Sequence, residues 1–137
     1  MNENSILVIY NARLVDSKID SPGTVIVESG KIQAVILGEC KTSKKALLFA
    51  SAFLSSSASD SQPELYDAHG LTLMPSFIDM HVHFRYPGQT QKEDLDSGLA
   101  AAVAGGYGTV VLMPNTKPVV SDKELAKKIM DEAKANI

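Results

Sequence analysis

The chain has 137 residues, of which 45% are hydrophobic and 21% are charged, and its formal net charge at pH 7 is −3. These values predict one globular domain, and the lack of a basic excess argues against nucleic acid or an anionic membrane as a partner. A single cysteine, Cys40, excludes an internal disulfide and suits a reducing compartment. The longest apolar run, residues 46–54, is about half as long as a bilayer span requires, and we find no targeting segment. We therefore expect a cytoplasmic protein.

The first part of the chain is rich in β-branched and aromatic residues. Residues 6–15 predict one or two strands, and residues 24–28 and 31–36 predict two more, joined by a hairpin turn at residues 29–30. Residues 16–23 contain Asp, Ser, Pro and Gly and predict a loop. Together these pieces predict a small all-β unit in which no residue suggests catalysis.

Residues 38–63 are an atypical insert, in which a lysine cluster is followed by a serine-rich stretch that predicts a flexible loop. Residues 46–54 within the insert could form a strand or a short helix, because their periodicity does not decide between the two. Residues 64–68 predict one more short strand. His69 stands alone before a turn, and we interpret it as structural or solvent-exposed rather than as a metal ligand.

The most informative stretch is residues 71–85, an apolar strand that contains a His-Val-His tripeptide. Apolar and polar residues largely alternate along its second half, as they do in a strand. The polar side chains that would share one face are those of Asp79, His81, His83 and Arg85. The two histidine Cα atoms would lie about 6.6 Å apart, close enough for both imidazoles to bind one metal ion. A bare His-x-His also occurs in ordinary strands, but the flanking charges and the position at a strand end favour a metal site.

Three further elements follow in the sequence. Residues 90–93 have the spacing of a capping box and predict the start of a helix, which ends at the Gly-Gly pair of residues 105–106. Gly98 and the many alanines indicate that this helix packs closely on a sheet. Residues 108–113 are a continuous β-branched run, as in strands that are buried on both faces of a parallel sheet. Residues 121–124 have capping-box spacing again and predict the start of a second helix.

The predicted order is a β-rich unit followed by β-α-β-α, which favours parallel βαβ units and an α/β fold. In such folds ligands gather at the C-terminal ends of the strands. The first of these ends carries His81, His83 and Arg85, and the second carries Asn115. The sequence therefore places two imidazoles, a guanidinium and an amide where a site would be expected.

Residues 79–88, DMHVHFRYPG, resemble the metal-binding motif of dihydroorotases in the amidohydrolase superfamily. The resemblance is dense over residues 67–118. Residues 6–36 resemble, more loosely, the small β-sandwich part that precedes the barrel in that family, whereas residues 38–63 have no counterpart that we recognise. An Arg two residues after the second His, followed by Pro-Gly, is similar to dihydroorotases rather than to hydantoinases or allantoinases.

The resemblance implies a binuclear zinc site to which His81 and His83 contribute, with Arg85 and Asn115 binding the carboxylate of a small-molecule substrate. It implies the reversible cyclisation of N-carbamoyl-L-aspartate to dihydroorotate in pyrimidine biosynthesis, in which the metals polarise the amide carbonyl and lower the pKa of a bound water. No catalytic residue is assigned in this chain, because the family's bridging ligand, later histidines and catalytic Asp have no counterpart in it. Asp79 is better interpreted as a hydrogen-bonding partner than as a ligand.

The resemblance also implies a (β/α)8 barrel, which takes roughly 250 residues, so we expect an incomplete barrel here. Residues 1–70 would be the β-rich, sandwich-type part with an insert at about 38–63, and residues 71–137 would be the first two β/α units. Ser76 stands where the family commonly has Gly. We expect the chain to be inactive alone and to form a homo-oligomer or to associate with the missing barrel portion. Two alternatives stay open: a non-catalytic homologue that binds a partner, and another cyclic amidohydrolase such as an allantoinase.

Overall fold

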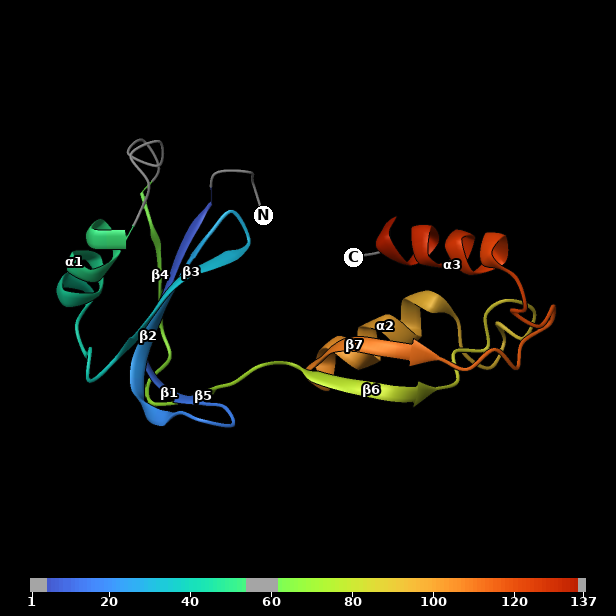
Figure 1. The fold of residues 1–137 in the computed structure, drawn as a ribbon, viewed down its shortest axis with the longest axis horizontal. Helices are drawn as coiled ribbons and strands as arrows, with labels where there is room; N and C mark the ends of the chain where they lie inside the picture. The colour runs from blue at the N-terminus through green and yellow to red at the C-terminus, as the bar shows by residue number, and fades with distance from the viewer. Residues whose placement is uncertain (1–4, 54–61, 136–137) are drawn as a thin grey trace. The chain divides into compact units, whose positions relative to one another are not determined.

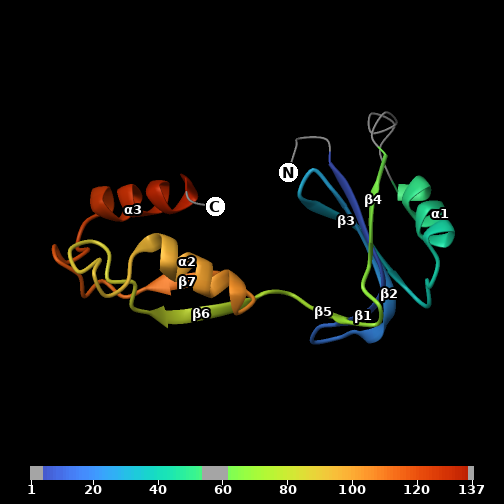
Figure 2. The same cartoon turned by 180° about the vertical axis from the view of Figure 1, so that it is seen from behind.

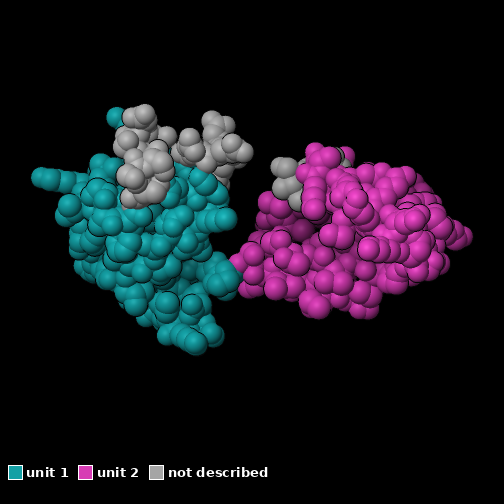
Figure 3. Space-filling model, turned by 45° about the horizontal axis from the view of Figure 1, so that its top comes forward, with its two compact units in different colours: residues 1–75 teal, residues 76–137 magenta. Residues whose placement is uncertain are grey.

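The computed structural model describes residues 5–53 and 62–135. The chain forms two compact units, Met1–Pro75 and Ser76–Ile137, which are coloured separately in Figure 3. Each unit has hydrophobic clusters of its own. Within the described ranges no helix is both long enough and apolar enough to cross a membrane.

The N-terminal unit is built on a five-stranded sheet, seen in Figure 1. Its strands are β1 (Ile6–Val15), β2 (Asp20–Glu28), β3 (Lys31–Leu37), β4 (Glu64–Asp67) and β5 (Thr72–Leu73). The sheet order is β3-β2-β1-β4, and β5 pairs with β1 as well. β1, β2 and β3 are antiparallel neighbours, whereas β4 and β5 run parallel to β1. The predicted β-rich unit is therefore confirmed in its strands.

Strand β1 carries the core of this unit on one of its faces. Its buried residues recur at every second position and are Ile6, Val8, Tyr10, Ala12 and Leu14. This alternation is the reason that the segment forms a half-buried strand. The predicted hairpin at residues 29–30 is confirmed, because both residues have positive φ angles (51° and 74°), as a two-residue turn between twisted strands requires.

The apolar part of the insert forms a helix, α1 (Ser43–Phe53), which settles the choice that periodicity left open. The Oγ1 of Thr42 accepts a hydrogen bond from the backbone N of Lys45 and so caps the helix N-terminus. Ala46 and Ala50 are buried in the same cluster as Ile6, Val8 and Tyr10 of β1. The serine-rich stretch lies mostly at residues 54–61, outside the described residues.

The predicted loop over residues 16–23 is wrong in its second half, because β2 already begins at Asp20. The Oδ1 of Asp16 accepts hydrogen bonds from the backbone N atoms of Lys18 and Ile19, which makes the turn short. Asp20 is then paired with Arg13 of β1 through both carboxylate oxygens. Side-chain pairing thus extends the strand through residues with low strand propensity.

The C-terminal unit has the order β6 (Phe77–Val82), α2 (Leu95–Ala104), β7 (Tyr107–Leu112) and α3 (Lys123–Ala135). Strands β6 and β7 are parallel neighbours, with Val82 in register with Leu112, and α2 connects them. Figure 2 shows α2 beside the two strands and α3 beyond it. The predicted parallel β-α-β-α order is confirmed.

The core of this unit is centred on Phe84, Leu95 and Ile129, which come from the loop after β6 and from the two helices. Gly98 faces Phe84 so closely that a β-carbon would lie 2.6–2.8 Å from ring atoms of the phenylalanine. Close packing at Gly98 is therefore confirmed, although its neighbour Phe84 lies in the loop after β6 and not in the sheet. The helix also ends as predicted, with Gly105 as its C-terminal cap.

Three expectations for this unit are wrong in detail. The strand predicted over residues 71–85 is two separate strands, and β6 ends at Val82. Helix α2 is capped by Asp94, which exchanges hydrogen bonds with Ser97, and does not begin at residue 90, because turns occupy the preceding residues. Helix α3 begins at Lys123 and not at residue 121. Its N-terminal cap is Asp122, whose carboxylate accepts a hydrogen bond from the backbone N of Leu125.

The burial predicted for residues 108–113 is also not found, since β7 is largely exposed. Its only strand partner among the described residues is β6. Strand β6 is exposed in the same way, with Ile78 at 61% and Met80 at 67% of full exposure. Side chains of this kind are typical of a sheet that is covered on both faces, so the pair presents apolar surface.

Candidate metal and carboxylate site

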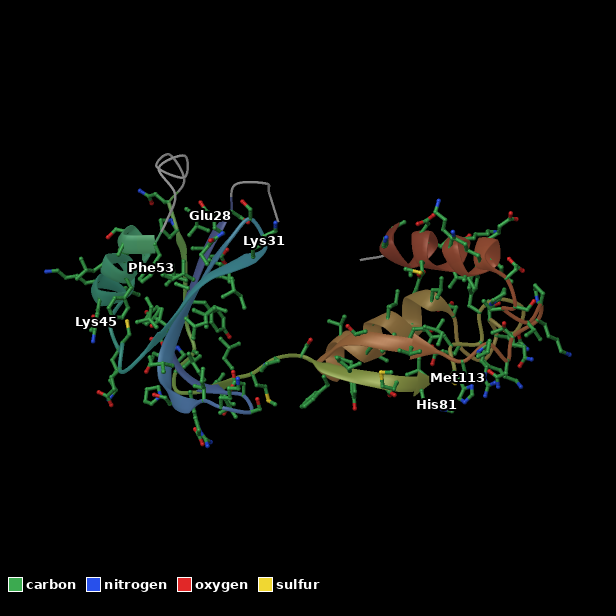
Figure 4. All side chains as sticks on the ribbon, viewed as in Figure 1. Glu28, Lys31, Lys45, Phe53, His81 and Met113 are labelled. Carbon is green, nitrogen blue, oxygen red and sulfur yellow. The ribbon has the colours of Figure 1, made fainter. Side chains whose placement is uncertain are left out.

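The predicted site residues lie at the C-terminal ends of β6 and β7. His81 belongs to β6, His83 follows its last residue, and Asn115 lies in the loop after β7. Figure 4 labels His81 and Met113 at this common end of the two strands. The backbone N of Met113 donates to the carbonyl of Val82 at 2.9 Å, so the two chain segments stay together past the strand ends.

The imidazoles of His81 and His83 lie against each other. Their Nε2 atoms are 3.2 Å apart, and their ring centroids are 5.0 Å apart at an interplanar angle of 67°. Both side chains are exposed to solvent. The proximity predicted from the His-x-His spacing is confirmed, although the strand ends between the two residues.

The distance between the two Nε2 atoms fits a shared zinc ion. Two nitrogen ligands at about 2.0–2.1 Å from a tetrahedral zinc lie about 3.3–3.4 Å from each other. Among the residues that the structure describes, no group of three His, Cys, Asp or Glu side chains could hold a metal ion. The described residues therefore bring two imidazole nitrogens together without a third candidate ligand.

Asn115 contacts the outer side of this histidine pair. Its Oδ1 lies 3.0 Å from the Nδ1 of His83, although 32 residues separate the two in the sequence. Since an amide oxygen can only accept, the hydrogen bond requires the proton of His83 to be on Nδ1. The Nε2 lone pair of His83 is then directed at His81. Nothing in the sequence spacing signals this contact.

Asp79 contacts the backbone of the first histidine. Its Oδ1 accepts a hydrogen bond from the backbone N of His81 at 3.0 Å. It therefore holds the strand end, which agrees with its interpretation as a hydrogen-bonding partner.

The loops after the two strands interlock. The backbone N of Lys117 donates to the carbonyl of Pro87 at 3.1 Å, and Gly88 has a φ angle of 95° beside the carbonyl of Lys117. Thr116 is buried, and its Oγ1 donates to the carbonyl of Pro118 at 2.7 Å. These contacts fix the loop that carries Asn115 against the loop that follows His83.

Arg85 is half-buried in the first of these loops, directly after the buried Phe84. Its guanidinium has no ion-pair partner among residues 5–53 and 62–135. The next residue, Tyr86, donates from its hydroxyl to the Oε2 of Glu132 on α3 at 2.6 Å. This hydrogen bond, followed by burial, raises the pKa of the Tyr86 phenol above its usual value. The loop that carries Arg85 is thus tied to helix α3 on one side.

Sequence comparison finds similarity to amidohydrolases. Residues 72–136 match the Amidohydrolase family. A dihydroorotase of Streptococcus thermophilus is 42% identical over 135 residues, which are 96% of this chain and 28% of that protein. A dihydroorotase of Deinococcus radiodurans is 58% identical over 71 residues, which are 52% of this chain and 17% of that protein. The chain resembles the N-terminal region of these relatives and spans about a quarter of their length or less.

Solved structures show the same fold. An L-hydantoinase of Arthrobacter aurescens superposes with a TM-score of 0.65 at 24% identity, covering 95% of this chain and 25% of that one. A β-aspartyl dipeptidase of Fervidobacterium islandicum superposes with a TM-score of 0.62 at 23% identity, covering 98% of this chain and 32% of that one. At this identity the likeness concerns the fold alone.

Proposed function

We propose that this chain, as a relative of the dihydroorotases in the amidohydrolase family, is the N-terminal part of a zinc-dependent dihydroorotase. The reaction would be the reversible cyclisation of N-carbamoyl-L-aspartate to dihydroorotate, a step of pyrimidine biosynthesis. The observation that carries the proposal is the pairing of the His81 and His83 Nε2 atoms at 3.2 Å beside Asn115, at the C-terminal ends of two parallel strands.

The fold that goes with this function is an incomplete (β/α)8 barrel. Residues 1–70 would be the small β domain with an insert at about 38–63, and residues 71–137 would be the first two β/α units. The exposed apolar side chains of β6 and β7 support this proposal, because barrel strands are covered by side-chain layers inside and by helices outside. The remaining strands would cover them.

His81 and His83 would hold one zinc ion of a binuclear site through their Nε2 atoms. When bound, zinc would polarise the amide carbonyl and lower the pKa of a water molecule. The remaining ligands and the catalytic acid–base group would come from residues outside this chain. The chain alone would therefore be inactive.

Arg85 and Asn115 would bind the substrate carboxylate that does not react. Cyclisation joins the ureido nitrogen to the carbon of the other carboxyl group and releases one water. A guanidinium can pair with a carboxylate through two parallel hydrogen bonds, which fixes the orientation of the substrate. The interlocked loops would keep Arg85 and Asn115 at a constant distance, so the reacting carboxyl group would be selected by position.

A chimera tests this function. The N-terminal region of the Streptococcus thermophilus relative is replaced by this chain, and the purified product is assayed for zinc content and for carbamoyl-aspartate cyclisation. We expect activity that is lost in the His81→Ala and His83→Ala variants and kept in a Gln91→Ala variant, which changes an exposed loop residue.

The same chimera distinguishes the alternatives. A folded, zinc-loaded chimera that turns over allantoin or hydantoins but not carbamoyl aspartate would replace the proposed substrate. A folded chimera without zinc and without any of these activities would favour a non-catalytic homologue. Size-exclusion chromatography of the active chimera would test the predicted homo-oligomer.

A further inference from the structure

We propose that Asn115 is a positioning residue for His83: its Oδ1 holds the imidazole in the tautomer with the proton on Nδ1, so that Nε2 keeps its lone pair. The contact between Oδ1 and Nδ1 at 3.0 Å carries the inference. The inference deepens the proposed function, and its part that concerns metal affinity rests on that function. The part that concerns the tautomer does not.

In a neutral imidazole, the contact with Asn115 determines which ring nitrogen of His83 keeps a lone pair. One ring nitrogen carries the proton and the other carries the lone pair, so fixing one fixes the other. With the proton on Nδ1, His83 donates to Asn115, and the lone pair on its Nε2 accepts a hydrogen bond from the Nε2 of His81 when no metal is bound. With the proton on Nε2, two lone pairs would face each other at 3.0 Å, and Nε2 could not bind a cation.

The loop that carries Asn115 is held firmly enough to do this. Pro114 accepts hydrogen bonds at its carbonyl from the backbone N atoms of Thr116 and Val120, at 2.9 and 3.3 Å. The buried Thr116 and the bond from Lys117 to Pro87 hold the other side of the loop. A side chain on a loop held in this way can orient a metal ligand. Metal-bound histidines commonly donate their other ring N–H to a carboxylate or a backbone carbonyl that has this effect.

The other end of the same amide has a different task. With Oδ1 on His83, the Nδ2 of Asn115 keeps two N–H donors, which under the proposed function would bind the substrate carboxylate. The amide would thus connect a metal ligand with the substrate. Substitution separates the two tasks: aspartate at this position keeps the acceptor for His83 and removes the donors, whereas alanine removes both.

The test measures the tautomer of His83 directly. The ring nitrogens of the metal-free 137-residue chain are observed by ¹⁵N NMR at a pH where the imidazoles are neutral. Wild type is compared with Asn115→Ala and Asn115→Asp, and with Lys117→Ala as a control in the same loop. The backbone amide spectrum of each variant shows whether its fold is kept.

We expect His83 to carry its proton on Nδ1 in wild type, Asn115→Asp and Lys117→Ala, and to shift towards Nε2 protonation in Asn115→Ala. Zinc titration of the same samples should show affinity about 10–100-fold lower in Asn115→Ala, with rescue in Asn115→Asp. An unchanged tautomer, or equal zinc affinity in wild type and Asn115→Ala, would overturn the inference. A wild-type chain with the expected tautomer but no zinc binding would leave the tautomer assignment supported, because the other ligands of the proposed site lie outside this chain. Zinc affinity would then be compared in the chimera, where a folded product without zinc would count against the proposed function.

Discussion

The carbonyl oxygen of Lys117 occupies the space in which a β-carbon of Gly88 would lie. This contact joins the loop after β6 to the loop after β7, so it fixes the two groups of candidate site residues relative to each other. Gly88 also has a φ angle of 95°, which residues other than glycine rarely adopt.

Replacement of Gly88 by alanine should therefore separate the two loops. We expect a loss of about 1–3 kcal/mol in the free energy of unfolding of the C-terminal unit, measured by urea denaturation, with loss of amide-exchange protection at Lys117. Gly30→Ala is the matched control, since Gly30 has a φ angle of 74° but no neighbour within 4 Å of a β-carbon. Equal losses in both variants would mean that backbone strain alone, and not loop contact, matters at Gly88.

Gly98→Ala should destabilise the chain although alanine favours helices. The gain in helix propensity is about 1 kcal/mol, whereas a β-carbon 2.6 Å from the ring of Phe84 imposes an overpacking cost of about 1–3 kcal/mol. A double-mutant cycle with Phe84→Leu checks the cause. We expect the cost of Gly98→Ala to be smaller in the Phe84→Leu background, and purely additive effects would contradict the contact.

Tyr86→Phe should make the chain less stable by about 1 kcal/mol, because a half-buried hydrogen bond to a carboxylate is lost. The pKa of Tyr86 is raised in the folded chain, so the stabilisation by its protonated hydroxyl is fully present below about pH 10. It disappears as the pH rises through the folded pKa. Urea unfolding at about pH 8 and about pH 11, on either side of the usual tyrosine pKa, measures this, with Tyr107→Phe as the control. A difference between wild type and Tyr86→Phe that is the same at both pH values would refute the assignment.

Helix α2 should lose its N-terminal cap in acid. Hydrogen bonds from the backbone N and the hydroxyl of Ser97 hold the pKa of Asp94 below its ordinary value of 3.8. The cap therefore stabilises the helix above that pH and is lost as the pH falls through the lower folded pKa. Amide exchange at Ser97 between about pH 2 and about pH 5 measures the loss. The Asp94→Asn variant keeps a capping side chain that does not titrate, so its protection should not change with pH.

Arg85→Lys should weaken substrate binding in the chimera although it keeps the charge. Lysine cannot form the forked pair with a carboxylate, and we expect KM for dihydroorotate to rise about tenfold or more, with a larger rise for Arg85→Ala. Steady-state kinetics measure both, and Lys117→Ala supplies a loop control that removes a neighbouring cation. An unchanged KM in Arg85→Ala would remove Arg85 from the site.

Much of this arrangement could be predicted because it depends on short-range pattern. The His-x-His spacing brings two rings together whether the second histidine lies within the strand or just after it, and the metal role of the pair stays a prediction. The alternation of strand and helix predicted the parallel pairing of β6 and β7. Gly98 signalled close packing, since glycine is otherwise costly in a helix.

What the pattern could not predict depends on contacts between distant residues. Residues 90–93 and Asp94 with Ser97 both have capping-box character, and the turns after Arg85 decide between them. The contact of Asn115 with His83 joins residues that are 32 positions apart, and no periodicity in the sequence predicts it. The exposure of β7 likewise depends on which neighbours cover a strand, and not on its composition.

The register of β6 and β7 has a consequence for how this region tolerates changes in length. Val82 pairs with Leu112, and this pairing determines how far the amide of Asn115 stands from the ring of His83. One residue inserted between Leu112 and Asn115 could displace the amide by about 3.3 Å, as far as a hydrogen bond is long. Residues added to the crossover within α2 would leave that distance unchanged. Insertions, natural or engineered, are therefore compatible with the site when they fall within α2. They are incompatible with the site when they fall between the end of β7 and Asn115.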